Sequence, residues 1–205
     1  RSALVVFACS LLFINTNWKY QLRVGAGILI AYWLLMCFVP TPGYGKAMLE
    51  PGKNLAAWLD SLLIPGRMWQ GTWDPEGVLS TFPAIVSGIA GMLTGRLIIN
   101  EMEQEKKLVW LFALGFLIYI AGCIWDWFFP INKNLWTSSY VLYTSGLAMM
   151  TLATAIWFVD IKGFTRWTKP GLVFGANSIA AYVLHGMLVS VFFIPIGIGA
   201  GAKYS

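Results

Sequence analysis

Residues 108–129 read LVWLFALGFLIYIAGCIWDWFF, and this stretch decides the fold. Its one charged residue, Asp126, stands near the end, and Pro130 follows directly. A helix that crosses a bilayer needs about 20 largely apolar residues, and proline is a poor continuation of a helix. A β-strand is excluded because the run is too long and does not alternate. The stretch therefore predicts a transmembrane helix that ends before Pro130.

The composition extends this prediction to the whole chain of 205 residues. Charged residues make up 11% of it, 58% are hydrophobic, and the mean hydropathy is +0.69. Soluble domains carry about 25% charged residues, and a domain of this size leaves much of its chain exposed. The same figures exclude a disordered chain. We therefore expect an integral membrane protein with the lipid bilayer as its partner.

Five further apolar runs accompany the first. Together they give six candidate spans, at residues 3–14, 24–39, 78–99, 108–129, 137–159 and 172–194, the last stopped by Pro195. The expected fold class is all-α, a polytopic transmembrane helix bundle that forms one region over residues 1–205. The sequence starts without Met and ends as if in mid-loop, so we expect a fragment of a longer protein.

The net charge of +5 is better explained by topology than by nucleic acid. The links after the first, third and fifth spans are short and basic, which places them in the cytoplasm. The links after the second and fourth spans then face outward. The longest basic block is the pair Lys106–Lys107, which is too short for a nucleic-acid patch. We therefore expect no nucleic acid as a partner.

Metal and disulfide sites are not expected either. The three cysteines, Cys9, Cys37 and Cys123, all lie inside apolar runs without a CxxC pair, and the chain has one histidine. This pattern is typical of cysteines packed in membrane helices. Zinc sites need several Cys or His ligands at short spacing, which this sequence lacks.

The outward link between the second and third spans is too long for a structureless connection. Leucines and Trp58 at helical spacing within residues 54–63 predict a short amphipathic helix that lies at the membrane interface. Trp69 and Trp73 are expected at headgroup depth.

Small residues recur four apart on the third span, at Ser87, Gly91 and Gly95. Such a stripe lets another helix approach closely. We take it as a packing signal without chemistry, and a homodimer is one arrangement that it permits.

The first motif, residues 71–81, reads GTWDPEGVLST and places Asp74 and Glu76 just before the third span. Acidic residues suit a helix N-terminus and Asp-Pro is a common helix entry, so a structural role is one interpretation. The other is that a carboxylate lines an outward-facing pocket, where it orients a base or binds a polar substrate.

The second motif, residues 125–139, reads WDWFFPINKNLWTSS. Its hydroxyls fit interhelical hydrogen bonding, which is common in membranes. The crowding of polar residues beside one lysine and two asparagines instead favours a polar cavity at the outer end of the bundle. The candidate lining residues are Asn132, Lys133, Trp136, Ser138 and Ser139.

The third motif, residues 175–185, reads GANSIAAYVLH. Asn177, Ala181 and His185 are four apart and so share one face of a helix. Amide and imidazole groups within a span are costly unless they are paired or face water. His185 is either a satisfied structural histidine or a general base, since histidine titrates near neutral pH.

In these three stretches the chain resembles the transmembrane acyltransferase family of heparan-alpha-glucosaminide N-acetyltransferase, which has bacterial relatives described as N-acetylglucosamine-related membrane proteins. The resemblance is carried by residues 73–81, 130–141 and 175–185. It corresponds to the later part of a family of about eleven spans. It implies transfer of an acetyl group from cytoplasmic acetyl-CoA to an amino sugar or glycan beyond the membrane, here the inner membrane of a bacterium.

The resemblance also suggests roles for the residues. Asp74 and Glu76 become orienting carboxylates, and Arg96 or Lys107 at the inner face would meet the phosphates of CoA rather than serve only as topology anchors. The family's catalytic histidine belongs to an earlier, outward-facing segment, so this fragment alone is expected to be inactive. His185 matches a separate, later histidine of the family.

Two other functions stay open from the sequence. A transporter of N-acetylglucosamine or related sugars would suit a polar stripe along the last two spans. Transporters of that kind often show inverted repeats and broken helices, and the sequence indicates neither. A purely structural or assembly role is the third interpretation, against which the polar loop motifs count.

Overall fold

The computed structural model describes residues 1–63, 73–166 and 168–193, with side chains as far as residue 188. It divides into two compact units, Arg1–Ile156 and Trp157–Ser205, and each is considered by itself. The predictions made for Trp69, for residues 71–72 and for the stop at Pro195 lie outside the described residues.

Every regular element in the described ranges is helical, which confirms the expected all-α class. The first unit contains α1 (Ser2–Asn15), α2 (Trp18–Phe38), α3 (Leu55–Leu63), α4 (Val78–Ile99), α5 (Gln104–Asp126) and α6 (Ser138–Ile156). The second unit contains the π-helical turn η1 (Trp157–Ile161), α7 (Thr168–Ala176) and α8 (Ser178–Phe193).

Four of these helices are long and apolar enough to cross a membrane: α2, α4, α5, and α6 with its continuation to Ile161. The pair α7 and α8 makes a fifth if it is counted as one broken span. Helix α1 is apolar but has 14 residues, a length of about 21 Å at the usual rise per residue. The hydrocarbon core is about 30 Å thick. The six expected spans thus become four or five, together with the short α1.

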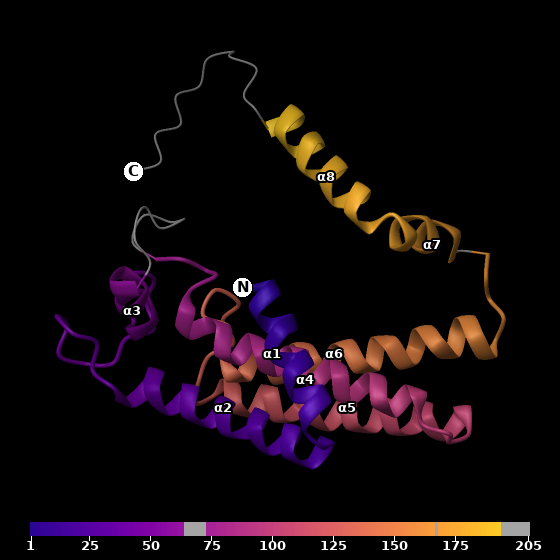
Figure 1. Ribbon diagram of the computed structural model, residues 1–205, viewed down its shortest axis with the longest axis horizontal. Helices are drawn as coiled ribbons and strands as arrows, with labels where there is room; N and C mark the ends of the chain where they lie inside the picture. The colour runs from indigo at the N-terminus through magenta and orange to yellow at the C-terminus, as the bar shows by residue number, and fades with distance from the viewer. Residues whose placement is uncertain (64–72, 167, 194–205) are drawn as a thin grey trace. The chain divides into compact units, whose positions relative to one another are not determined.

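Helix α4 is central to the first unit, because it contacts α1, α2, α3, α5 and α6. In Figure 1 α2, α5 and α6 run alongside it, and α3 lies beyond one end of the long helices. The bounds of α4 are those that the sequence predicts. Helix α2 begins at Trp18 instead of residue 24, because the Asn17 side chain caps it by accepting a hydrogen bond from the Tyr20 N–H at 2.9 Å.

Helices α5 and α6 approach each other closely at three glycines. A Cβ on Gly146 would overlap the Tyr119 backbone nitrogen and the Gly115 carbonyl oxygen, and a Cβ on Gly122 would lie 2.5 Å from the Tyr143 nitrogen. Small residues allow this backbone approach, which is a usual source of helix association in membranes. The α5–α6 hairpin is therefore fixed by glycines on both helices.

Within the described residues, the small-residue stripe of α4 makes no close helix contact at its glycines. Gly91 and Gly95 have no atom within 4 Å of an added Cβ, and the Ser87 hydroxyl accepts a hydrogen bond from Trp136. A close approach occurs instead at Gly88, where an added Cβ would lie 2.5 Å from the Cys9 sulfur of α1. Packing of another helix against the stripe stays a prediction.

One apolar cluster joins the connections at one end of the first unit. Tyr32 and Met36 of α2 pack with Ala56 of α3 and with Phe129 and Leu135 from the link between α5 and α6. We call this end, formed by residues 39–63, 73–77 and 127–137, the outer end, after the side of the membrane that the loop charges predict for it. The opposite end, formed by residues 15–17 and 96–103, is the inner end.

Helix α3 forms where the amphipathic pattern predicts it. Its buried residues are Ala56, Ala57 and Asp60, whereas Leu62 and Leu63 are exposed. The face that contacts the protein is therefore the small-residue face, and the leucine face is left for an apolar surrounding such as lipid.

The second unit departs from the expected continuous span 172–194. Helices α7 and α8 meet at 92°. The break falls at Asn177, whose backbone N–H and side-chain Nδ2 both donate to the Val173 carbonyl oxygen, at 3.1 and 3.0 Å. Side-chain amides that bond to nearby backbone compete with the helical pattern in this way. The expectation that no helix is broken was wrong here.

Candidate functional site

At the outer end, α3 and α4 are capped by side chains. The Asn54 side chain accepts from the Ala57 N–H at 2.9 Å and begins α3. Helix α4 has Gly77 at its N-cap position, which offers no side chain, and the Val78 N–H donates instead to Asp60 of α3 at 2.8 Å. The cap of α4 thus comes from Asp60, not from the acidic residues that precede the helix.

Asp60 and Gly77 fit closely. The Asp60 side chain is 1% exposed, and a Cβ on Gly77 would overlap its carboxylate. Burial raises the pKa of the Asp60 carboxyl, the hydrogen bond from Val78 opposes that shift, and the nearby charge of Asp74 adds to it. Asp60 and Asp74 therefore lie close enough to repel each other.

The predicted carboxylates Asp74 and Glu76 lie in the turn before α4. Asp74 is half-buried, and its Oδ1 accepts from the Glu76 N–H at 2.7 Å, while its carbonyl accepts from the Gly77 N–H at 3.2 Å. The Glu76 side chain is exposed. The turn consequently presents the Glu76 carboxylate outward and uses Asp74 to hold its own backbone.

Arg1 connects this turn with the second motif. Its guanidinium donates to the Pro75 carbonyl at 2.7 Å and lies over the Trp136 ring, 4.3 Å from the ring centroid. An arginine over an indole face gains about 0.5–2 kcal/mol. The two motifs, which are separated by two long helices in sequence, therefore meet at one side chain.

Trp136 is held from several directions. Its Nε1 donates to the Ser87 hydroxyl at 3.1 Å, and its ring stands edge-on to Tyr140 with centroids 5.2 Å apart. Its φ angle is 53°, in the left-handed region that bulky residues avoid. Strain of this kind costs about 1–3 kcal/mol and is concentrated at functional sites. The indole is thus held in a fixed position beside the turn at Asp74–Glu76, which we call the acidic turn.

The link between α5 and α6 is tied by its own polar groups. The Asp126 carboxylate accepts from the Ile131 N–H at 2.6 Å, and Asn132 exchanges hydrogen bonds with Thr137 at 3.0 and 3.2 Å. The Asn132 side chain accepts from the N–H groups of Asn134 and Leu135. Lys133 stands exposed at the tip.

Ser138 and Ser139 are fully buried. The Ser138 hydroxyl donates to the Leu29 carbonyl of α2 at 2.7 Å, and the Ser139 hydroxyl donates to the Phe129 carbonyl. Tyr32 of α2 also donates to the Leu135 carbonyl, at 2.6 Å. The hydroxyls of Ser138 and Tyr32 position the link against α2, and the substrate contact predicted for Ser138 and Ser139 stays a prediction.

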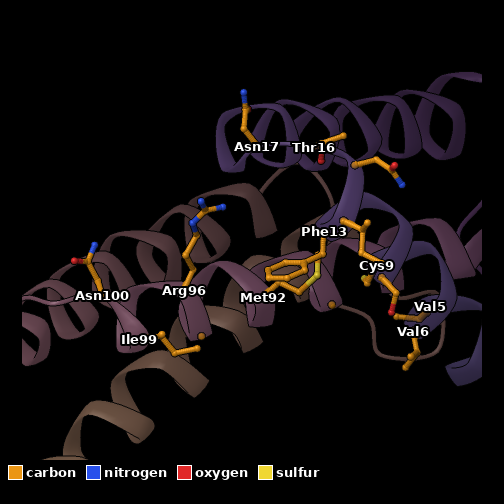
Figure 2. A pocket seen from close by; sticks show the side chains of 15 residues that line it. Val5, Val6, Cys9, Phe13, Thr16, Asn17, Met92, Arg96, Ile99 and Asn100 are labelled. Atoms are coloured by element: carbon orange, nitrogen blue, oxygen red, sulfur yellow. The ribbon is translucent and has the colours of Figure 1, made fainter.

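A cavity of about 1210 Å³ lies toward the inner end, between α1 and α4. Its walls are largely apolar and include Val5, Cys9, Phe13 and Met92. Polar side chains gather at the inner end: Asn15, Thr16, Asn17, Arg96 and Asn100. Figure 2 shows Arg96 and Asn100 on α4, with Thr16 and Asn17 on the side of the α1–α2 connection.

Arg96 is exposed at this cavity, as the predicted position at the inner face requires. Lys107 is half-buried near the start of α5 and is not among the residues that line the cavity. The sequence thus identified one cationic lining residue. It missed the neighbouring asparagines, which gave no signal beyond standing at helix ends.

Asn177 and His185 belong to the second unit, where both are exposed. Asn177 marks the break between α7 and α8, so the stripe expected along one face is interrupted there. Ala181 and His185 still share a face of α8. The roles predicted for Asn177 and His185 stay predictions.

Sequence reasoning missed Asp60, Gly77 and Arg1, the residues that organise the acidic turn. A signal was available for Asp60, because it is the single acidic residue in the helical segment LAAWLDSLL. A charged residue among apolar ones in a membrane protein is costly and is usually paired. No pattern in the sequence indicated its partner, which lies 18 residues away. No group of three or more His, Cys, Asp or Glu side chains suited to a metal ion occurs in the described ranges.

Comparison with known proteins shows what the chain is similar to. No protein-family model matches the chain. The chain is 31% identical to heparan-alpha-glucosaminide N-acetyltransferase of Mus musculus over 216 residues, which cover 89% of this chain and 32% of that protein. It is 29% identical to the Homo sapiens protein of the same name, with the same coverage. The chain thus spans about a third of the length of the curated relatives it matches. Over most of its own length, this membrane protein is similar to one part of the heparan-alpha-glucosaminide N-acetyltransferases.

Proposed function

We propose that this chain is part of a membrane-embedded acetyltransferase that moves an acetyl group from acetyl-CoA to an amino sugar. The relatives are named for N-acetyl transfer to a glucosaminide, which supports the reaction class. The observation that carries the proposal for this chain is the contact of Arg1 with both Pro75 and Trp136, because it brings the acidic turn and the polar link together.

The outer end is assigned to the acceptor. An amino sugar offers an amine and several hydroxyls, which carboxylates and an indole face recognise well. Glu76 and Asp74 orient the amine, Trp136 supplies a flat apolar surface, and Lys133 and Asn132 lie nearby on the link. Ser138 and Ser139 support the link from beneath. On this proposal His185 and Asn177 serve as polar contacts within the membrane.

The cavity between α1 and α4 is assigned to the donor, acetyl-CoA. Its volume of about 1210 Å³ exceeds the range of about 300–1000 Å³ typical of small-molecule sites, so it has room for a ligand of this size. Arg96 gives its polar end the positive charge that phosphates require. Lys107 lies outside this cavity. Its assigned role is to attract the phosphates of CoA toward the inner surface of the membrane by its charge. The bound donor supplies the activated acetyl group.

The reaction is tested by measuring transfer of labelled acetyl from acetyl-CoA to glucosamine by the complete protein. Asp74→Asn and Glu76→Gln are expected to lower kcat/KM by about 100-fold, within the range for positioned carboxyl groups. Asp126→Asn is the matched control, because Asp126 holds the neighbouring link and keeps an acceptor oxygen as Asn. Full activity of both acidic-turn variants, or no transfer by the unmodified protein, would overturn the proposal.

Transport of an amino sugar is the second candidate, favoured by the 92° break between α7 and α8. Discontinuous helices often build the substrate sites of transporters. Uptake of labelled N-acetylglucosamine into proteoliposomes, with no acetylated product formed from glucosamine, would favour this function. Acetylation without net uptake would exclude it.

The proposed location is the inner membrane of a bacterium, with the inner end in the cytoplasm. The charges near the inner end support this orientation, since its two short connections are flanked by Lys19, Arg23, Arg96, Lys106 and Lys107. A homodimer is compatible with the proposal but is not required by it.

A further inference from the structure

We propose that Asp60 is a positioning residue for the acceptor site, and that it holds the acidic turn at Asp74–Glu76 in register by capping α4 from α3. The inference rests on the proposed function, because it assigns that turn to the amino sugar. It goes further by making the affinity for the acceptor depend on a residue of α3 that does not contact the acceptor.

The first step is the unusual origin of the cap. Helix N-termini are usually capped by the residue at the N-cap position itself. Here that residue is Gly77, and the acceptor for the Val78 N–H comes from Asp60, 18 residues earlier. The start of α4 is therefore placed by α3, and a displacement of α3 would be passed to the residues directly before α4.

The second step is the close contact between Asp60 of α3 and Gly77 at the start of α4. The Asp60 carboxylate occupies the space that a side chain at residue 77 would need. The Gly77 N–H in turn donates to the Asp74 carbonyl at 3.2 Å. A short series of contacts thus leads from Asp60 through Gly77 to Asp74.

The third step is the anchoring of α3 itself. Asn54 caps α3 and also donates to the Glu50 carbonyl at 2.8 Å, and Ala56 lies in the apolar cluster with Tyr32 and Phe129. Because α3 is fixed to α2 and to the α5–α6 link, Asp60 is held on a packed element. The acidic turn is therefore positioned, through α3, by the same apolar cluster that supports the link between α5 and α6, which carries Trp136.

The kinetic test measures KM for glucosamine and for acetyl-CoA in the complete protein. Asp60→Ala is expected to raise KM for glucosamine about tenfold, since loss of a cap of about 1–2 kcal/mol has this size. KM for acetyl-CoA should stay within about twofold. Asp60→Asn keeps an acceptor oxygen and should restore KM for glucosamine. Gly77→Ala, which displaces the carboxylate from the other side, should reproduce the effect of Asp60→Ala.

Ser61→Ala is the matched control, because it removes a side-chain hydrogen bond from the neighbouring position of α3, where the exposed Ser61 hydroxyl donates to the Trp58 carbonyl of the same helix at 2.6 Å. It should leave both KM values within about twofold of the unmodified protein. The proposal is overturned if Ser61→Ala shifts KM for glucosamine as far as Asp60→Ala does, if both KM values rise together, or if Asp60→Asn is as damaging as Asp60→Ala.

Hydrogen exchange of the Val78 amide gives a readout that does not require activity. Exchange should accelerate in Asp60→Ala and Gly77→Ala, and should stay slow in Asp60→Asn and Ser61→Ala. Unchanged exchange in Asp60→Ala would refute the cap and the inference with it. If the unmodified protein transfers no acetyl group, the proposed function and the kinetic part of this inference fail together, while slow Val78 exchange that depends on Asp60 would still confirm the positioning.

Discussion

At the scale of single residues, the outer end is organised by side chains that satisfy backbone groups belonging to other segments. Asp60 accepts from Val78, Asp126 accepts from Ile131, and Ser138 donates to Leu29. Unpaired backbone groups are costly in an apolar surrounding. The polar residues of the motifs are therefore partly structural and partly available to a ligand. Glu76 and Lys133 are exposed, and Asp74 is half-buried.

The hydrogen bond between Trp136 and Ser87 can be tested by a double-mutant cycle. Trp136→Phe and Ser87→Ala each remove the same bond, so each should lower the free energy of unfolding by about 1 kcal/mol. The double variant should cost no more than about the larger single effect, because only one bond is lost. Unfolding in detergent measures all three. Strict additivity would show that the bond contributes nothing.

The pH dependence of stability depends on Asp60. Burial raises the pKa of its carboxyl, so the folded protein binds this proton more tightly than the unfolded chain does. The resulting stabilisation is complete below the ordinary pKa of about 3.9 and is lost as the pH rises through the raised pKa. Among the described residues, the titratable groups that face Asp60 are Asp74 before α4 and Tyr32 of α2.

Asp60→Asn removes this titration while keeping an acceptor for Val78. The melting temperature of Asp60→Asn, relative to the unmodified protein, should therefore increase between pH 4 and pH 7. Asn54→Ala has no titrating group, and its difference from the unmodified protein should stay constant over the same range. A constant difference for Asp60→Asn would contradict the assignment.

At the scale of elements, helices pack most closely where a glycine of one helix contacts the backbone of its neighbour. The α5–α6 pair depends on Gly115, Gly122 and Gly146, whereas Gly91 of α4 has open space around it. Overpacking of a tight contact typically costs about 1–3 kcal/mol, while Gly to Ala in an open helical position gains up to about 1 kcal/mol.

Gly146→Ala is expected to destabilise the bundle by about 2 kcal/mol or more, because its Cβ would overlap the backbone of α5. Gly91→Ala is the control, and it should be neutral or slightly stabilising. Thermal unfolding in detergent compares the two. Equal effects would mean that α5 and α6 do not pack through Gly146.

The elements themselves were largely predictable from the sequence. The bounds of α4 and the existence of α3 follow from hydropathy and periodicity, which act locally. The cap by Asp60, the contact at Gly88 and the junction at Arg1 were not predictable, because each joins residues that only the packed bundle brings together. The break at Asn177 was missed because the run around it is apolar enough on average to span a membrane, and mean hydropathy carries no information about a bend.

At the scale of the whole molecule, the first unit separates two kinds of chemistry. The acidic turn and the link with Trp136 lie at the outer end, and the polar end of the cavity, with Arg96, lies at the inner end. The two loop motifs meet at Arg1, the cluster beneath them is apolar, and the polar cavity expected there stays a prediction. This separation suits a reaction whose donor and acceptor arrive from opposite sides of a membrane.

Sidedness is the first consequence of that arrangement. A single cysteine introduced at Lys133 should react with an impermeant maleimide from outside intact cells, and one at Asn100 should react only after the membrane is opened. The variants need a background in which Cys9, Cys37 and Cys123 are replaced by Ala. Labelling of both positions from one side would show that the loop charges misplace the two ends.

The most direct measurement is acetyl transfer across a sealed membrane. Inverted vesicles containing the complete protein would be loaded with glucosamine, and labelled acetyl-CoA would be added only to the outside, which exposes it to the inner end. We predict N-acetylglucosamine in the vesicle interior, lowered by Glu76→Gln and by Arg96→Ala. Product formed only when donor and acceptor share one compartment, or no product at all, would contradict the assignment of the two ends.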